Sequence, residues 1–155
     1  MLPYDGERSA GEGGDVAYLL AALGGALGAL ARSGVATVLP SSPGGWPWAT
    51  MLVNLTGCLL MGVLLAVLLA RFPASPWLRP FLATGVLGGY TTFSTFSVDT
   101  VALVDAGRTT LAGGYVVASV LGGVLAVVAG VYAGRAAVRA TDTVDAELVA
   151  GEGWS

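Results

Sequence analysis

The ten residues GGYTTFSTFS, from Gly88 to Ser97, decide how the fold of this chain is interpreted. They lie in the middle of an apolar block, from about Phe81 to Leu103, that is long enough to span a bilayer. Two adjacent glycines followed by two threonines form a poor helix, so the pattern predicts a helix break near residues 88–92. Inside a membrane, the unpaired backbone groups of a break are tolerated only where they are buried in protein or line a cavity or an ion site.

The composition of the whole chain indicates an integral membrane protein. Of its 155 residues, 55% are hydrophobic and 11% are charged, and the mean hydropathy is +0.77. A soluble domain would carry about 25% charged residues. The chain has no histidine, which removes the commonest metal ligand and proton shuttle, and its single Cys58 cannot form an intrachain disulfide. The net charge of −3 argues against nucleic-acid binding.

Four apolar blocks predict an all-α membrane protein with four transmembrane helices. Each block has roughly 20 residues or more, about 30 Å as a helix, which matches the hydrocarbon core. We therefore expect one four-helix domain over residues 16–134, with both ends on the same side of the membrane. Residues 1–15 and 135–155 are predicted to be disordered tails, and the sequence shows no cleaved signal peptide. The blocks run from about Val16 to Leu39, Trp48 to Ala70, Phe81 to Leu103 and Leu111 to Gly134.

Small residues recur at helical spacing and predict close contacts between helices. Gly24 and Gly28 are four residues apart, as are Gly85 and Gly89. The last block carries a ridge of small residues at every fourth position from 122 to 134. In lipid, helices associate through close van der Waals contact, which such ridges allow.

Hydroxyls and aromatic rings crowd the centre of the third block. Phe93 and Phe96 are three residues apart and share a helix face. The positive edges of their rings can favour an anion, hydroxyls can donate hydrogen bonds to it, and freed carbonyls are ligands for a hard cation. The bland alternative is that the rings only pack and that the hydroxyls bond their own helix. The hydroxyls belong to Thr91, Thr92, Ser94, Thr95 and Ser97.

Other polar residues within the apolar blocks leave two or more interpretations open. Asn54 bonds a partner helix or faces a water-filled path, and Arg32 either reaches the headgroups or forms an electropositive vestibule. Tyr115 and Ser119, four residues apart, taken singly are more typical of an interfacial belt and a self-bonded helical serine. Asp99 is a proton-linked site, a vestibule charge or a helix-end residue.

Four parts of the sequence resemble the fluoride ion channel family known as Fluc or CrcB. They are GGALGALAR (Gly24–Arg32), ATMLVNLTGCLLMG (Ala49–Gly62), GVLGGYTTFSTFS (Gly85–Ser97) and the pair Tyr115 and Ser119. The third is the most specific, and the resemblance ranges from about residue 17 to residue 134, nearly the whole of the expected folded part.

The resemblance implies a passive fluoride channel of the plasma membrane, built as an antiparallel dimer of four-helix subunits with two fluoride pathways. It implies a buried sodium ion on the two-fold axis, held by the backbone carbonyls of Gly88 and Thr91 from both subunits. Phe93 and Phe96 are then pore-lining rings, and Arg32 lies near a vestibule. The hydrogen-bond donors along the path are Asn54, Ser94, Thr95, Tyr115 and Ser119.

Three positions depart from the family pattern. Ala49 replaces the usual glycine before Thr50, Gly123 replaces a frequent second serine of the last helix, and Asp99 replaces a common glutamate. The change at Gly123 shortens the expected row of polar residues, and the change at Asp99 shortens any vestibule carboxylate.

The arginines are distributed unequally between the two sides of the expected membrane domain. Five fall on the side of the chain ends and one or two on the other, which predicts a fixed orientation with the ends inside. An antiparallel homodimer needs insertion both ways, so a heterodimer with an oppositely oriented homologue stays open beside the homodimer. The five are Arg8, Arg71, Arg79, Arg135 and Arg139, against Arg108 and Arg32.

Two other functions compete with the channel. A small proton-coupled transporter of the antiparallel four-helix type needs a carboxylate within the membrane, and only Asp99, late in the third block, is available. A non-transporting membrane scaffold would use none of the polar residues for conduction. No ATP-binding or catalytic motif is present, so we expect no enzyme.

Overall fold

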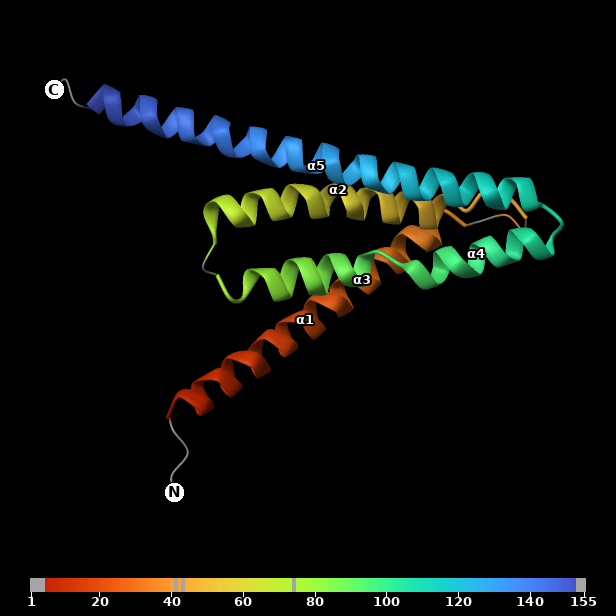
Figure 1. The fold of residues 1–155 in the computed structure, drawn as a ribbon, viewed down its shortest axis with the longest axis horizontal. Helices are drawn as coiled ribbons and strands as arrows, with labels where there is room; N and C mark the ends of the chain where they lie inside the picture. The colour runs from red at the N-terminus through yellow and green to blue at the C-terminus, as the bar shows by residue number, and fades with distance from the viewer. Residues whose placement is uncertain (1–4, 41, 43, 74, 153–155) are drawn as a thin grey trace.

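The computed structural model describes residues 5–152 except 41, 43 and 74, with side chains described within 14–143. The regular structure of this part of the chain is helical throughout (Figure 1). Its elements are α1 (Asp5–Val38), α2 (Trp48–Arg71), the π-helix η1 (Arg79–Leu87), α3 (Gly88–Tyr90), α4 (Phe93–Asp105) and α5 (Thr109–Glu152).

Three of the described helices contain stretches that are long and apolar enough to cross a membrane. These are Gly14–Val38, Trp48–Arg71 and Thr109–Thr143. The remaining apolar block is divided among η1, α3 and α4, none of which spans a bilayer alone. The all-helical membrane fold is therefore confirmed, while the four-span topology stays a prediction.

The outer helices extend beyond the apolar blocks that predicted them. Helix α1 begins at Asp5 rather than near Val16, and α5 continues to Glu152 rather than ending near Gly134. The helices therefore extend beyond the apolar blocks, while the disorder expected in residues 1–15 and 135–155 stays a prediction. The segment added to α5, residues 135–152, contains five alanines, which favour helix, so this helix can continue in water beyond the membrane. The segment added to α1, residues 5–15, contains one alanine and four glycines, so its helix has no such support from propensity.

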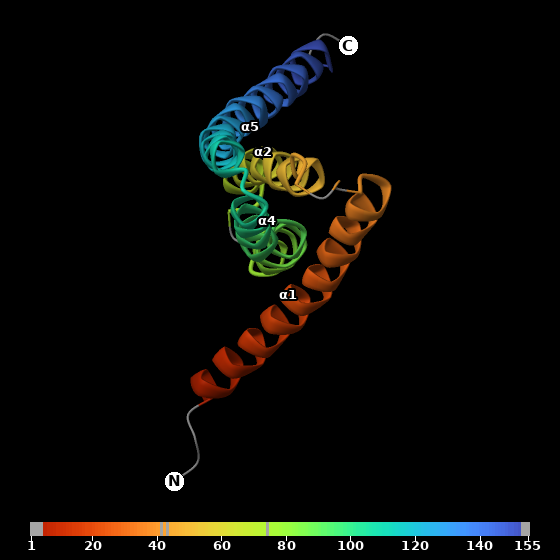
Figure 2. The same cartoon turned by 90° about the vertical axis from the view of Figure 1, so that its right-hand side faces the viewer.

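The helices form two closely packed pairs. Helix α1 packs against η1 and α3, and α2 packs against α5. Figures 1 and 2 place α1 and α5 on opposite flanks of α2 and the interrupted helix. The start of α1 and the end of α5 both lie on the left in Figure 1 and lie far apart in Figure 2.

Glycines bring both pairs into backbone contact, which confirms the packing predicted from their spacing. A Cβ atom on Gly85 would stand 2.8 Å from the carbonyl oxygen of Ala21 in α1, and one on Gly134 would stand 2.8 Å from the carbonyl oxygen of Val63 in α2. Real Cβ atoms do not approach backbone this closely, so only glycine permits these separations.

The interruption lies at Thr91 and Thr92, inside the predicted range. Thr91 has φ −73° and ψ 156°, and Thr92 has φ −147° and ψ 122°, so two extended residues separate α3 from α4. At the other end of α4, Gly107 adopts a positive φ of 73°, and the Arg108 amide donates to the Leu103 carbonyl at 2.9 Å. This glycine-dependent termination lets the chain reverse into α5.

Candidate functional site

Asn54 of α2 holds the interruption by pairing with the backbone of Thr92. Its Nδ2 donates to the Thr92 carbonyl oxygen at 2.9 Å, and the Thr92 amide donates to its Oδ1 at 2.8 Å. The side-chain amide therefore gives the Thr92 N–H an acceptor that the helices do not supply, and it adds a donor to the carbonyl of this N-cap residue. Of the two alternatives for Asn54, the interhelical hydrogen bond is present, and its second Nδ2 hydrogen remains for another acceptor.

Thr92 also begins α4. Its Oγ1 accepts a hydrogen bond from the Thr95 amide at 3.1 Å, and it lies 3.0 Å from the Thr95 Oγ1 and 3.2 Å from the Ser94 Oγ. The N-terminus of a helix carries a partial positive charge and unpaired N–H groups. The cap therefore places an anion-attracting helix end in the middle of the apolar block, beside two further hydroxyls.

A groove of about 370 Å³ extends along α2, α4 and α5 at this position. Asn54 and Ser119 contribute polar groups to it, and both phenylalanines of the central stretch lie in its wall. The structure thus brings together four of the predicted pathway residues. Its lining includes Asn54, Cys58, Met61, Thr92, Phe93, Phe96 and Ser119.

A second cavity of about 270 Å³ lies on the other side of Thr92. Arg32 of α1 lines it together with Thr50, Ser94 and Thr95. Among the described residues Arg32 forms no salt bridge, so its charge is available to the cavity. Of the alternatives for Arg32, this geometry favours the electropositive vestibule over contact with headgroups alone.

Two buried hydroxyls on α5 have no hydrogen-bond partner among the described residues. They are the Tyr115 Oη and the Ser119 Oγ, and Tyr115 has no exposed surface. A buried polar group without a partner is costly, so it calls for an explanation, such as a transient ligand. The next position of this row is Gly123, where an added Cβ would stand 3.6 Å from the Cys58 Sγ.

Aromatic rings connect the helix break to the loop before α2. The ring centroids of Phe93 and Phe96 are 5.7 Å apart, and those of Phe96 and Tyr115 are 5.3 Å apart. Trp46 meets the Tyr115 ring edge-on at 5.7 Å. Phe93 is 80% exposed, whereas Phe96 is half-buried, so the two rings occupy different environments in a single chain.

Asp99 lies against α2. The Thr50 Oγ1 donates to its Oδ2 at 2.6 Å, and the Asp99 residue is half-buried. This contact excludes a simple helix-end residue that meets only solvent, because Thr50 is buried. The proton-linked and vestibule interpretations of Asp99 remain.

The two carbonyls expected to hold a cation lack their usual helical partners. The amide four residues after Gly88 is that of Thr92, which donates to Asn54 instead. The amide four residues after Thr91 is that of Thr95, which donates to the Thr92 Oγ1. Carbonyl oxygens freed in this way suit a hard cation such as sodium, so the donor set fits the implied ion. Gly88 is also exposed on the surface of the single chain.

Some contributors to this site were missed by sequence reasoning. Thr92 was recognised as part of a break but not as the residue that Asn54 and the α4 N-terminus share. Trp46 and Thr50 received no role, although Trp46 covers Tyr115 and Thr50 bonds Asp99. Threonine is a preferred N-cap residue, so a threonine at the end of the predicted break and before the next apolar residues could have identified Thr92 as the cap.

Comparison with known proteins identifies the family. The family described as CrcB-like protein, Camphor Resistance (CrcB), matches residues 19–131, which include α2 and the whole interrupted helix. The chain belongs to the CrcB family. The resemblance found in the sequence is thereby confirmed, and the matched residues contain every position of the candidate site.

Curated relatives in this family carry the name fluoride-specific ion channel. FluC 2 of Streptomyces avermitilis is 49% identical over 107 residues, 68% of each chain. FluC of Paracoccus denitrificans is 48% identical over 118 residues, 76% of this chain and 94% of its own. FluC 2 of Nocardia farcinica is 45% identical over 126 residues, 81% of this chain and 87% of its own.

Proposed function

We propose that this chain is a subunit of a passive, fluoride-selective ion channel of the plasma membrane, which lets cytoplasmic fluoride leave down its gradient. The observation that carries the proposal is the α4 N-terminus, capped by Thr92 in the middle of the apolar block and flanked by hydroxyls. Relatives that share nearly half of its residues are named fluoride-specific ion channels. Fluoride that enters as neutral HF and dissociates in the cytoplasm would leave by this route.

The fluoride path in this proposal follows the two cavities that meet at Thr92. Arg32 attracts the anion into the vestibule, where Ser94 and Thr95 replace part of its hydration shell. From there, the anion passes the ring edges of Phe93 and Phe96 into the groove along α2 and α5. The free Nδ2 hydrogen of Asn54 and the unpartnered hydroxyls of Tyr115 and Ser119 supply donors along the second half.

A structural sodium ion belongs to the same proposal. The carbonyls of Gly88 and Thr91 would hold it, since neither is used by its helical partner. The ion would supply a fixed positive charge that the unpaired carbonyls of two helix breaks, one from each subunit, would coordinate. Two subunits are needed, because one chain offers only two of these carbonyls and a sodium site uses more.

The exposed face around the break supports an antiparallel pair. Phe93 is 80% exposed, and Gly88 and Ser94 are exposed beside it. A second copy, or an oppositely oriented homologue, would cover this mid-membrane face and complete the path. The unequal arginines favour the homologue, and the fluoride channel needs only that the two subunits oppose each other.

Fluoride efflux from liposomes that contain the purified chain tests the function. A fluoride electrode records the efflux, chloride-loaded vesicles provide the selectivity control, and the proton gradient is varied to separate a channel from a proton-coupled transporter. We expect rapid efflux of fluoride but not chloride, without dependence on the proton gradient. Absence of efflux from well-folded protein, both alone and together with an oppositely oriented homologue, would contradict the proposal.

A further inference from the structure

Trp46, in the loop that leads into α2, lies against the buried ring of Tyr115. The ring centroids are 5.7 Å apart and the ring planes are inclined by 87°, an edge-to-face contact. The indole Nε1 donates to the Met51 Sδ at 3.1 Å, which ties the loop residue to the first turn of α2. An added Cβ on Gly114 would meet the Trp46 ring at 3.9 Å, so the ring also lies on α5.

Aromatic contacts hold the Tyr115 ring on two sides. The Tyr115 hydroxyl has no hydrogen-bond partner among the described residues. Tyr115 lies between Trp46 and Phe96, whose ring centroid is 5.3 Å away. Phe96 belongs to the interrupted helix, whereas Trp46 comes from outside the membrane helices. The position of a pathway donor therefore depends on a residue of the connecting loop.

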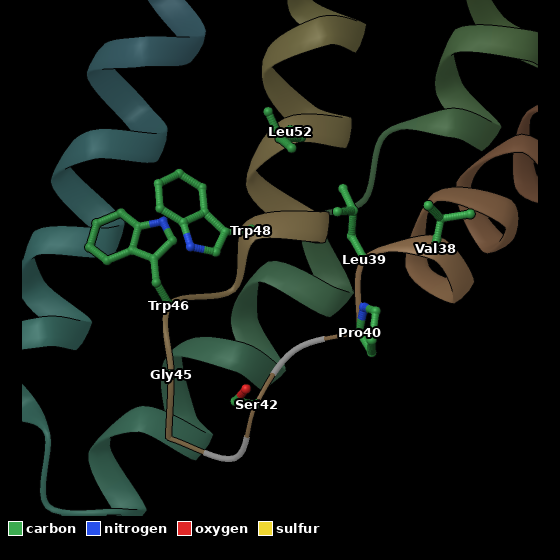
Figure 3. Close-up of a pocket in the computed structure, with 8 residues that line it drawn as sticks. All are labelled: Val38, Leu39, Pro40, Ser42, Gly45, Trp46, Trp48 and Leu52. Atoms are coloured by element: carbon green, nitrogen blue, oxygen red, sulfur yellow. The ribbon is translucent and has the colours of Figure 1, made fainter.

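Trp46 also borders open space. It lines a cavity of about 500 Å³ between the end of α1 and the start of α2, with Val38, Leu39 and Trp48 in the wall (Figure 3). Close packing that would otherwise hold a buried ring is therefore incomplete around Trp46. The contacts that hold it are the hydrogen bond to Met51, the ring of Tyr115 and the small core cluster to which Tyr115 belongs.

We propose that Trp46 is a positioning residue for fluoride conduction, which holds the Tyr115 ring and thereby the position of its hydroxyl. The inference rests on the proposed channel function and adds to it a residue from the loop between α1 and α2. Trp46 does not touch the anion, and it acts only through the Tyr115 ring.

Fluoride efflux from liposomes tests the inference through the matched pair Trp46→Ala and Trp48→Ala. Trp48 is of the same type, lies two residues away and is 59% exposed. Its ring is tilted by 43° against that of Trp46, with the centroids 5.9 Å apart. We expect Trp46→Ala to lower the efflux rate about two- to tenfold, the factor that corresponds to an aromatic contact of roughly 0.5–1.5 kcal/mol. Trp46→Phe, which keeps an aromatic edge but loses the hydrogen bond to Met51, should recover only part of the rate, and Trp48→Ala should stay near the wild type.

A double-mutant cycle with Tyr115→Phe separates positioning from a general effect on structure. If Trp46 acts through the hydroxyl, Trp46→Ala adds little to the loss already caused by Tyr115→Phe. An equal loss in both backgrounds overturns the inference, as does a Trp48→Ala variant that matches Trp46→Ala. If Trp46→Ala does not assemble, the efflux rate of Met51→Leu tests the inference instead, because this substitution conserves side-chain volume and removes the sulfur that accepts the Trp46 hydrogen bond. A reduced rate supports the inference, and an unchanged rate overturns it.

The same measurements separate this inference from the function on which it rests. A wild-type chain that does not conduct, alone or with an oppositely oriented homologue, overturns both. A conducting wild type whose rate is insensitive to Trp46 overturns only the positioning role.

Discussion

Replacing Gly28 by alanine should separate α1 from the interrupted helix. The added Cβ would stand 2.7 Å from the amide nitrogen of Tyr90, and closer still to the carbonyl oxygen of Val86. Ordinary contact begins near 3.4 Å, so the two backbones must move apart by about 0.7 Å or more. Overpacking of this kind costs about 1–3 kcal/mol, and a rigid backbone neighbour places Gly28→Ala toward the upper end.

The neighbouring glycine provides a matched control. Gly25 lies in the same helix three residues earlier, and a Cβ added there meets nothing within 4 Å. Both substitutions exchange glycine for alanine inside a helix, which by itself favours the helix by about 1 kcal/mol. Gly25→Ala should therefore be neutral or stabilising, while Gly28→Ala is destabilising.

Thermal unfolding in detergent, followed by circular dichroism, measures the difference, and fluoride efflux from liposomes measures its consequence. We expect a lower melting temperature and slower efflux for Gly28→Ala alone, because α1 holds η1 and α3 on one side of the break. Equal melting temperatures for the two variants would refute the backbone contact between α1 and α3 as described.

Three further substitutions test the site and its surroundings. Asn54→Asp loses the donor to the Thr92 carbonyl and places a negative charge against that carbonyl. Fluoride efflux should therefore fall, and the free energy of unfolding should drop by about 1–3 kcal/mol. An efflux rate and a melting temperature equal to those of the wild type would contradict this. Phe93→Ile removes an aromatic edge from the groove, so efflux should fall while assembly, checked by gel filtration, persists; undiminished flux would remove Phe93 from the path. Asp142→Asn breaks an exposed ion pair with Arg71 and should change the free energy of unfolding by less than about 1 kcal/mol. A larger loss would mean that this contact holds α2 and α5 together.

The helix break was predictable because its signal is local. Gly88 and Gly89 lower the local helix propensity, and the hydroxyls of the threonines that follow compete with the helix for backbone hydrogen bonds. The break near residues 88–92 therefore follows from the residues themselves. The glycine contacts were predictable for a similar reason, because a spacing of four places small residues on one helix face. The family motif had the same advantage, since it is contiguous in sequence.

The partners across helices could not be predicted in the same way. Asn54 was expected to face a partner or a water path, but its bond to Thr92 depends on the register of α2 against the break. Trp46 lies in a loop rich in proline and glycine, whose path over Tyr115 is set by tertiary packing rather than by any local pattern. The helix limits differ from the apolar blocks for another reason: hydropathy marks where an apolar block ends, whereas helices α1 and α5 continue beyond it.

Helix α5 has a consequence for the two sides of the membrane. Its 44 residues extend about 66 Å, roughly twice the hydrocarbon thickness, and Arg71 binds its emerging part through Asp142 at 2.8 Å and through the Val138 carbonyl at 3.2 Å. In an antiparallel pair, one such rod would stand in the cytoplasm and its counterpart would stand outside the cell. Only the outer rod would meet extracellular proteases. The fraction of chains whose α5 is cleaved when intact cells are treated with protease would therefore measure how many subunits are inserted in each direction.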